Sequence, residues 1–200
     1  MLIVKIDTCM EKTRCPWAVY NGWNQIYHDT EWGVPLHDDT MLFEFLILDA
    51  FQAGLSWLTI LKKRENFRKA FDNFDANIIA TYSEDKIQTL MQDNGIIRNQ
   101  MKIRAAVSNA QAFLKLQKEY GSFDKYIWQF TNYQSIVNKW HDHTHVPVST
   151  KESDSMSKSL KKNGFKFVGT TICYAFMQAS GMINDHTVSC FRYNEVQEKY

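Results

Sequence analysis

The chain has little proline and glycine, with three prolines and eight glycines in 200 residues. Because these residues interrupt helices and mark turns, their scarcity predicts long helices joined by few turns. No stretch of eighteen consecutive apolar residues is present, which excludes a membrane-spanning helix. The start, MLIVKID, is too short and too soon charged for a secretory signal. We therefore expect a cytoplasmic protein with no membrane partner.

An excess of one charge is also absent, because 23 basic and 22 acidic residues leave a net charge of +1. This balance argues against a protein that depends on nonspecific attraction to phosphate, although it permits a local basic patch. The four cysteines are expected to be thiols or metal ligands rather than disulfides in a reducing compartment. The length suits one well-buried core, and the sequence has no repeat, linker or low-complexity segment. One all-α unit is predicted.

The apolar pattern and the capping residues predict most of the helices. Their expected spans are 39–53, 58–71, 75–81, a helix that Ser83 caps and Asn94-Gly95 ends, 100–119, 122–130, 154–163 and 170–180. The helix over 58–71 is expected to expose a basic face. Glycine and proline predict irregular structure between residues 14 and 38, and residues 131–150 are predicted to be a surface connection.

The stretch LFEFLILDAFQAGLSW, residues 42–57, is apolar at nearly every position, which predicts a buried core helix. Asp49 lies within it. Burying a lone carboxylate is costly, so Asp49 needs a hydrogen-bond or charge partner, or must hold its proton. The helix ends near Trp57, which indicates a pocket with an acid and an aromatic wall. A core helix whose acid caps a neighbouring backbone is the alternative.

Two pairs of soft ligands lie near opposite ends of the chain: Cys15 and His28 near the start, His186 and Cys190 near the end. Two cysteines and two histidines can fill a tetrahedral zinc site completely, so such a site would be structural and would join the two ends. Unrelated core thiols and histidines are the alternative. Cys173 is expected to be an inert core thiol. The remaining histidines are expected to be solvated: His37, His141, His143 and His145.

The segment GFKFVG, residues 164–169, separates two predicted helices. Glycine lets a backbone approach a phosphate closely, and the helix start at Thr170 offers free amides and the positive dipole end. Four lysines surround the segment: Lys158, Lys161, Lys162 and Lys166. The pattern predicts a sequence-independent contact with a DNA backbone, or an ordinary corner between two helices with a solvated lysine face.

Aromatic residues are abundant, at 14%, and many lie in the irregular segment near the start. Aromatic faces attract positive charge, and a carboxylate such as Asp49 accepts hydrogen bonds from ring-attached N–H groups. A flipped-out, alkylated and therefore cationic base fits this combination. Simple core packing of the aromatics is the alternative.

Six segments resemble the DNA-3-methyladenine glycosylase I family, in the right order and from about Arg14 to Cys190. They are RCPW, YHDTEWGVP, LFEFLILDAFQAGLSWLTILKKREN, GIIRNQMKI, SKSLKKNGFKFVGTTICYAFMQASG and NDHTVSC. The resemblance implies a helix–hairpin–helix DNA glycosylase fold with a zinc site joining the N- and C-terminal segments. It places a single glycosylase domain at 14–192, between an N-terminal extension (1–13) and a C-terminal tail (193–200).

The resemblance also implies a function in base-excision repair. The protein would be a monofunctional, monomeric enzyme that hydrolyses the N-glycosidic bond of 3-methyladenine in double-stranded alkylated DNA and releases free 3-methyladenine. The implied site residues are the following: Asp49 as the base-contacting acid; Tyr27, Trp57, Trp17 and Trp32 around the base; Gly164, Lys166, Gly169 and Thr170 at the DNA backbone; and Cys15, His28, His186 and Cys190 around one structural zinc ion.

Two positions depart from the family pattern. The family's acid is often glutamate where this chain has Asp49, and a pocket tyrosine of the family falls on Asn24, beside Trp23. Asp185, next to His186, is expected to support that metal ligand. From the residues alone two other functions stay open. One is a zinc hydrolase, which requires an open coordination position, and the other is a zinc-stapled module that recognises damaged DNA without cutting it.

Overall fold

The computed structural model describes residues 12–198. Its helical elements are η1 (Pro16–Ala18), α1 (Gly22–Thr30), α2 (Asp39–Gln52), α3 (Trp57–Ala70), η2 (Asp72–Phe74), α4 (Ala76–Ile79), α5 (Glu84–Gln92), α6 (Gln100–Tyr120), α7 (Phe123–Trp128), η3 (Gln129–Thr131), η4 (His143–His145), α8 (Lys151–Lys162), α9 (Thr170–Ala179) and α10 (Arg192–Glu198). Two short strands, β1 (Ile136–Val137) and β2 (Ile183–Asn184), pair in parallel. The predicted all-α class is confirmed, with these two strands as a small addition.

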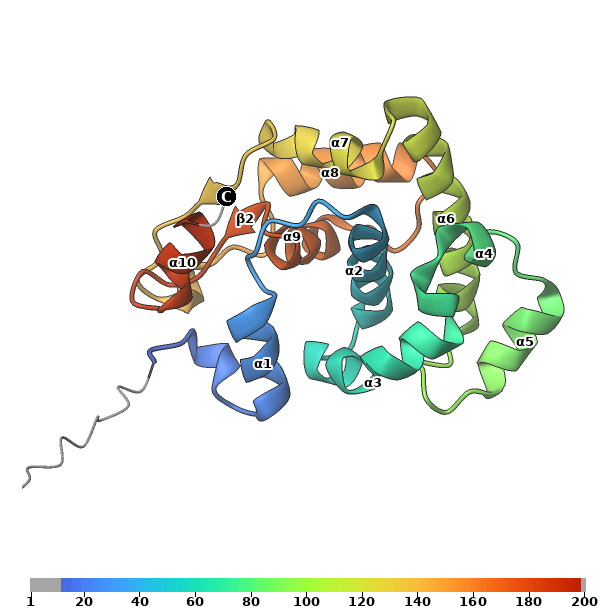
Figure 1. The fold of residues 1–200 in the computed structure, drawn as a ribbon, viewed down its shortest axis with the longest axis horizontal. Helices are drawn as coiled ribbons and strands as arrows, with labels where there is room; N and C mark the ends of the chain where they lie inside the picture. Colours follow the sequence, from blue (N-terminus) through green and yellow to red (C-terminus); the bar gives the residue numbers. More distant parts are fainter. Residues whose placement is uncertain (1–11, 199–200) are drawn as a thin grey trace, which may run out of the picture.

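Helix α2 lies at the centre, with α9 beside it and α3, α6 and α7 packed around it (Figure 1). The side chain of Asp38 caps its start by accepting a hydrogen bond from the Met41 amide. Every residue from 42 to 51 is buried, as the apolar run predicts. At its other end the ammonium of Lys102 donates to the carbonyls of Phe51 and Ala53, at 2.8 and 2.6 Å. The Lys102 ammonium therefore pairs with carbonyl groups at the C-terminal end of α2, where the helix leaves backbone acceptors unpaired.

The other predicted helices are present, with ends that shift by a few residues. The largest shift is at α8, which begins at Lys151 because Thr150 and Ser153 form a capping box. Helix α6 ends at Gly121, whose φ of 86° suits glycine alone. Short η2 and η3 turns adjoin α3 and α7.

Two helices were not predicted. Helix α1 lies where irregular structure was expected, and α10 lies in the expected tail. The side chain of Asn21 caps α1, but Trp23 and Ile26 face solvent while Tyr27 and His28 are buried. Because apolar residues occur on the exposed face of α1 as well as on the buried one, they do not recur at helical spacing, and the sequence pattern did not indicate a helix. Apart from residues 12 and 13, the predicted N-terminal extension lies outside the described residues.

The predicted basic face of α3 is wrong in part. Arg64 is buried and binds Glu31, which directly follows α1, and Glu44 of α2, with nitrogen–oxygen distances of 2.6 and 2.5 Å. Arg68 also binds Glu44, at 2.8 Å. These arginines join α3 to α2 and to the end of α1. The lysines Lys62 and Lys69 of α3 are exposed, whereas the ammonium of Lys63 donates to two backbone carbonyls before α6.

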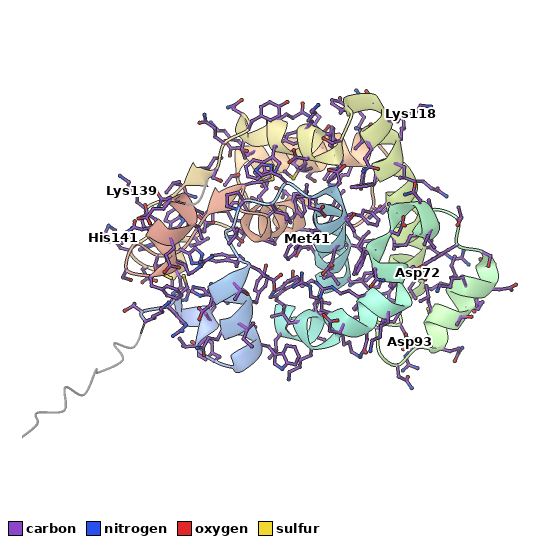
Figure 2. All side chains as sticks on the ribbon, viewed as in Figure 1. Met41, Asp72, Asp93, Lys118, Lys139 and His141 are labelled. Carbon is purple, nitrogen blue, oxygen red and sulfur yellow. The ribbon has the colours of Figure 1, made fainter. Side chains whose placement is uncertain are left out.

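The connection over residues 131–150 is mostly exposed, as predicted, although β1 forms within it. Figure 2 shows Lys139 and His141 at the outer edge of the molecule. His37 is exposed too, and its ring stacks on Trp128 beside Asp124. Between residues 12 and 198, no helix combines the length and apolarity that crossing a membrane requires.

Candidate active site

The four predicted metal ligands lie together. Their candidate ligand atoms are within 4.8 Å of one another, and all four residues are buried. The sulfur of Cys190 is 3.3 Å from Nε2 of His28 and 3.5 Å from Nδ1 of His186, and the sulfur of Cys15 is 3.6 Å from the same Nδ1. The cluster connects η1 and α1 with the segment before α10, so it joins the two ends of the described chain as predicted.

Both histidines are oriented through their second ring nitrogen. Nδ1 of His28 is 2.8 Å from the carboxylate of Asp29, which Arg14 holds in turn, and Nε2 of His186 is 3.0 Å from the carbonyl of Trp32. Metal-binding histidines use their outer nitrogen in this way, because it leaves the inner nitrogen as a lone-pair donor. The donor set and its supports therefore fit a tetrahedral divalent metal ion.

The two cysteines of the cluster influence each other. A hydrogen bond from Cys15, together with the two imidazoles, lowers the pKa of the Cys190 thiol. The hydrogen bond to that thiolate and burial raise the pKa of Cys15. The backbone also closes around the cluster: a Cβ on Gly33, whose φ is 80°, would stand 2.9 Å from Nε2 of His186. Gly33 is thus required for the close approach of the chain to that ring.

A pocket of about 410 Å³ lies beside this cluster, between η1, α1, α2, α3 and α9. Its aromatic walls are the four residues predicted to surround a base: Trp17, Tyr27, Trp32 and Trp57. The rings of Tyr27 and Trp57 have centroids 5.2 Å apart, and those of Trp17 and Trp32 are 5.0 Å apart. These four rings form a connected aromatic lining rather than separate core contacts. Their role with a base stays a prediction.

Asp49 lines the same pocket and is 2% exposed. Its Oδ2 atom is buried and has no hydrogen-bond partner, and Nε1 of Trp57 is likewise buried and unpaired. Burial raises the pKa of Asp49 well above the ordinary aspartate value, and the charge of Arg64 opposes this only in part. The protein partner that the sequence led us to expect is therefore not present among the described residues. A carboxylate and an indole N–H are instead available to a ligand.

This unpaired acid should reduce stability at neutral pH. Its folded-state pKa is raised, so the cost of a buried charge is present above that pKa and disappears as the pH falls through it toward the ordinary value. We expect Asp49→Asn to raise the free energy of unfolding by about 1–3 kcal/mol at pH 7.5, with a smaller gain at pH 4.5. Thermal unfolding at both pH values measures this. The exposed Asp85→Asn should show no such difference, and a D49N gain that grows toward acid pH would contradict the assignment.

Asp185 does not support His186, contrary to the expectation from the sequence. Both ring nitrogens of His186 are used elsewhere, by the two sulfurs and by the carbonyl of Trp32. Asp185 instead lines the pocket, where its buried carboxylate accepts four hydrogen bonds. The donors are Asn138, Trp140, Tyr174 and Gln178. Asn24 lines the pocket as well, whereas the neighbouring Trp23 is half exposed and is not a lining residue.

The hairpin between α8 and α9 holds the predicted DNA-backbone residues. Phe165 and Val168 anchor it in the core, and Gly164 has a φ of 94°. Asn109 binds both the amide and the carbonyl of Lys166, so that amide is not free for phosphate, whereas the lysine side chain is exposed. Gly169 begins α9 without a side-chain cap.

Comparison with known proteins decides the family. The family model for methyladenine glycosylase matches residues 17–193. The chain belongs to the methyladenine glycosylase family. The DNA-3-methyladenine glycosylase 1 of Escherichia coli strain K12 is 48% identical over 180 residues, which cover 90% of this chain and 96% of that relative. The assignment made from sequence motifs is confirmed, and it favours a glycosylase over both the zinc hydrolase and the non-cutting DNA-binding module.

Solved structures of methyladenine glycosylases share the fold. A crystal structure of 3-methyladenine DNA glycosylase I is similar with a TM-score of 0.87 and 47% identity, covering 90% of this chain and 98% of that one. A tyrosine-to-phenylalanine variant of such an enzyme, in complex with 3-methyladenine, has a TM-score of 0.86 and 34% identity over 89% of this chain and 96% of its own. The helical architecture predicted from the family resemblance is therefore confirmed.

Proposed function

We propose that this protein is a base-excision repair enzyme that hydrolyses the N-glycosidic bond of 3-methyladenine in alkylated DNA, with Asp49 as the acid that contacts the base. The activity and the base are those named for two curated relatives that are 48% and 47% identical over 90% and 89% of this chain. The observation that carries the residue assignment is the aromatic pocket with an unpaired, buried carboxylate. Such a pocket has to receive a flat ligand that brings its own hydrogen-bond donors.

The chemistry suits a pocket without a strong acid or a lysine nucleophile. Alkylation at N3 makes the base cationic, so it leaves the sugar without first being protonated. The rings of Tyr27 and Trp57 attract the positive charge of the extruded base, and Asp49 accepts a hydrogen bond from its amino group. These interactions strengthen discrimination against neutral, undamaged bases, which lack the charge.

The metal proposed for the cluster of Cys15, His28, His186 and Cys190 is one structural zinc ion. Soft sulfur and imidazole ligands in a buried, four-ligand set favour zinc. When bound, the ion would supply a cross-link between the two ends of the domain. Four protein ligands leave no coordination position for a substrate or a reactive water, so base release relies on the pocket residues.

The α8–α9 hairpin is the proposed contact with the DNA backbone. The uncapped amides at Gly169 and Thr170 suit a phosphate, and the exposed ammonium of Lys166 adds charge at the neighbouring turn. Gly164 allows the turn between helix and hairpin through its positive φ. Such contacts would position the duplex and would not read its sequence.

Removing the Lys166 charge should weaken binding to alkylated and unmodified duplexes by a similar factor, roughly 3- to 10-fold at low salt. The slope of log K against log salt should fall by about one, because one fewer counterion is released. Titration of labelled duplex at several salt concentrations with Lys166→Ala measures both quantities. Lys118→Ala, an exposed lysine near the C-terminal end of α6 (Figure 2), is the matched control. If the slope of log K against log salt is unchanged in K166A, Lys166 does not contact the DNA phosphates.

The proposed function itself is tested by mass analysis of bases released from methylated duplex DNA. Release of 3-methyladenine with intact strands is expected, since a monofunctional enzyme leaves an abasic site. If the protein binds the methylated duplex but releases no base at high enzyme concentration, it recognises damage without excising it, and the proposed function is wrong. Its oligomeric state and cellular location stay predictions.

A further inference from the structure

Two amide side chains line the pocket, Gln178 from α9 and Asn24 from α1. A primary amide has an acceptor oxygen on one side and two N–H donors on the other. Its orientation therefore decides which of the two a ligand meets. In both residues the orientation follows from a neighbouring group that can only accept a hydrogen bond.

The NH₂ group of Gln178 is directed at Asp185. Its Nε2 donates to Oδ2 of Asp185 at 2.7 Å, and Tyr174 donates to the same oxygen at 2.6 Å. The other oxygen receives N–H groups of Asn138 and Trp140 at 2.7 and 2.6 Å. Each oxygen of this carboxyl group therefore accepts from two donors. Gln178 must therefore turn its NH₂ group toward Asp185, which leaves its carbonyl oxygen for the pocket.

The orientation of the Asn24 amide is also fixed, in this case by a backbone carbonyl. Its Nδ2 donates to the carbonyl of Trp17 at 3.2 Å. Its Oδ1 is consequently turned the other way, and this atom is buried without a hydrogen-bond partner. Oδ2 of Asp49 is also buried and unpaired. The pocket thus holds three acceptor groups from three different helices, and its lining among residues 12–198 also offers the unpaired indole N–H of Trp57 and the amide of Gln52.

We propose that Asn24 and Gln178 are specificity-determining residues, whose carbonyl oxygens select a base with N–H donors over one with a carbonyl at the same edge. This inference rests on the proposed function and deepens it. An adenine-type base carries an amino group at C6, which has two N–H donors, whereas a guanine-type base carries an oxygen there. An oxygen facing these acceptors leaves buried polar groups unpaired, which costs more than one missing hydrogen bond. Asp185 acts as the positioning residue for Gln178.

The test compares 3-methyladenine with 3-methylguanine as released bases. Gln178→Met and Asn24→Leu keep the approximate shape of each side chain and remove its acceptor. We expect each variant to lower kcat/KM for 3-methyladenine about tenfold, which corresponds to about 1.4 kcal/mol, with 3-methylguanine unchanged or released faster. The ratio of the two kcat/KM values should therefore fall about tenfold or more. Gln88→Met, on the exposed face of α5, is the matched control and should keep the wild-type ratio.

The ratio separates a specificity role from structural damage, because a loosened pocket lowers release of both bases by a similar factor. The two variants lie on different helices, so a folding failure in one leaves the other as the test. An unchanged ratio in a folded variant that still releases 3-methyladenine overturns the assignment of that residue and leaves the proposed function intact. A wild-type protein that releases neither base overturns the proposed function, and this assignment with it.

Discussion

Asp49→Asn should lower kcat/KM for 3-methyladenine release by about 10- to 100-fold. A hydrogen bond to a charged group contributes about 1.5–3 kcal/mol, and the variant replaces the carboxylate by a neutral amide. Single-turnover release of 3-methyladenine from methylated duplex measures the change. Asp85→Asn, on exposed α5, is the matched control. Full excision with full selectivity for the methylated base in D49N would show that Asp49 does not contact it.

The pH profile gives a second reading of Asp49. Burial raises the pKa of this acid. As the pH is lowered, the wild-type enzyme should therefore begin to lose activity at a pH well above the ordinary aspartate pKa. The carboxylate takes up a proton there and no longer attracts a cationic base. Asp49→Asn should lack this acid limb. A wild-type profile that stays flat down to the ordinary aspartate range would contradict the raised pKa.

Loss of the proposed zinc ion should have the largest effect on stability. Structural zinc contributes several kcal/mol to folding in small domains, and the four candidate ligand atoms are buried within 4.8 Å of one another. We expect Cys15→Ala to lower the free energy of unfolding by about 5 kcal/mol, or Tm by roughly 10–20 °C in a domain of this size. Elemental analysis should find one zinc ion per chain in the wild type and none in C15A.

The chain provides a control for the loss of a buried cysteine. Cys173 is also buried, but its sulfur contacts the carbonyl of Val168 and lies outside the cluster. Burial raises the pKa of Cys173 to about 12, which agrees with the inert thiol expected from the sequence. Cys173→Ala should keep the zinc ion and lose only about 1–2 kcal/mol. A similar small loss in C15A, with no zinc in the wild type, would refute the metal site.

The sequence predicted best those features that depend on local pattern. The run around Asp49 is apolar on all sides, which identifies the central helix without reference to its neighbours. The residues alone left the hairpin and the metal-ligand cluster open, and both were predicted from the resemblance to the glycosylase family. Asn21 was the available signal for α1, because its side chain caps the helix, but solvent-facing Trp23 and Ile26 masked the period.

The features that the sequence did not reveal depend on contacts between distant segments. The sequence places Arg64 among several exposed basic residues, but in the fold Glu31, after α1, and Glu44, of α2, bind it. The donors to Asp185 come from the 131–150 connection and from α9, and no spacing rule links them. The directions of the Asn24 and Gln178 amides follow from such contacts as well, since each is set by one acceptor that only the folded chain brings near.

The cluster that joins residues 15 and 28 to residues 186 and 190 has a consequence for the order of synthesis. Three walls of the pocket, Trp17, Tyr27 and Trp32, leave the ribosome first, whereas α9 and the last two ligands leave it at the end. Chains are synthesised at roughly 5–20 residues per second, so on the order of ten seconds separate the synthesis of the early segment from that of the residues it contacts. A nascent chain that has not yet reached residue 185 therefore has neither a closed cluster nor a complete pocket. The pocket and the cluster that joins its early and late segments are complete only once Cys190 has been added.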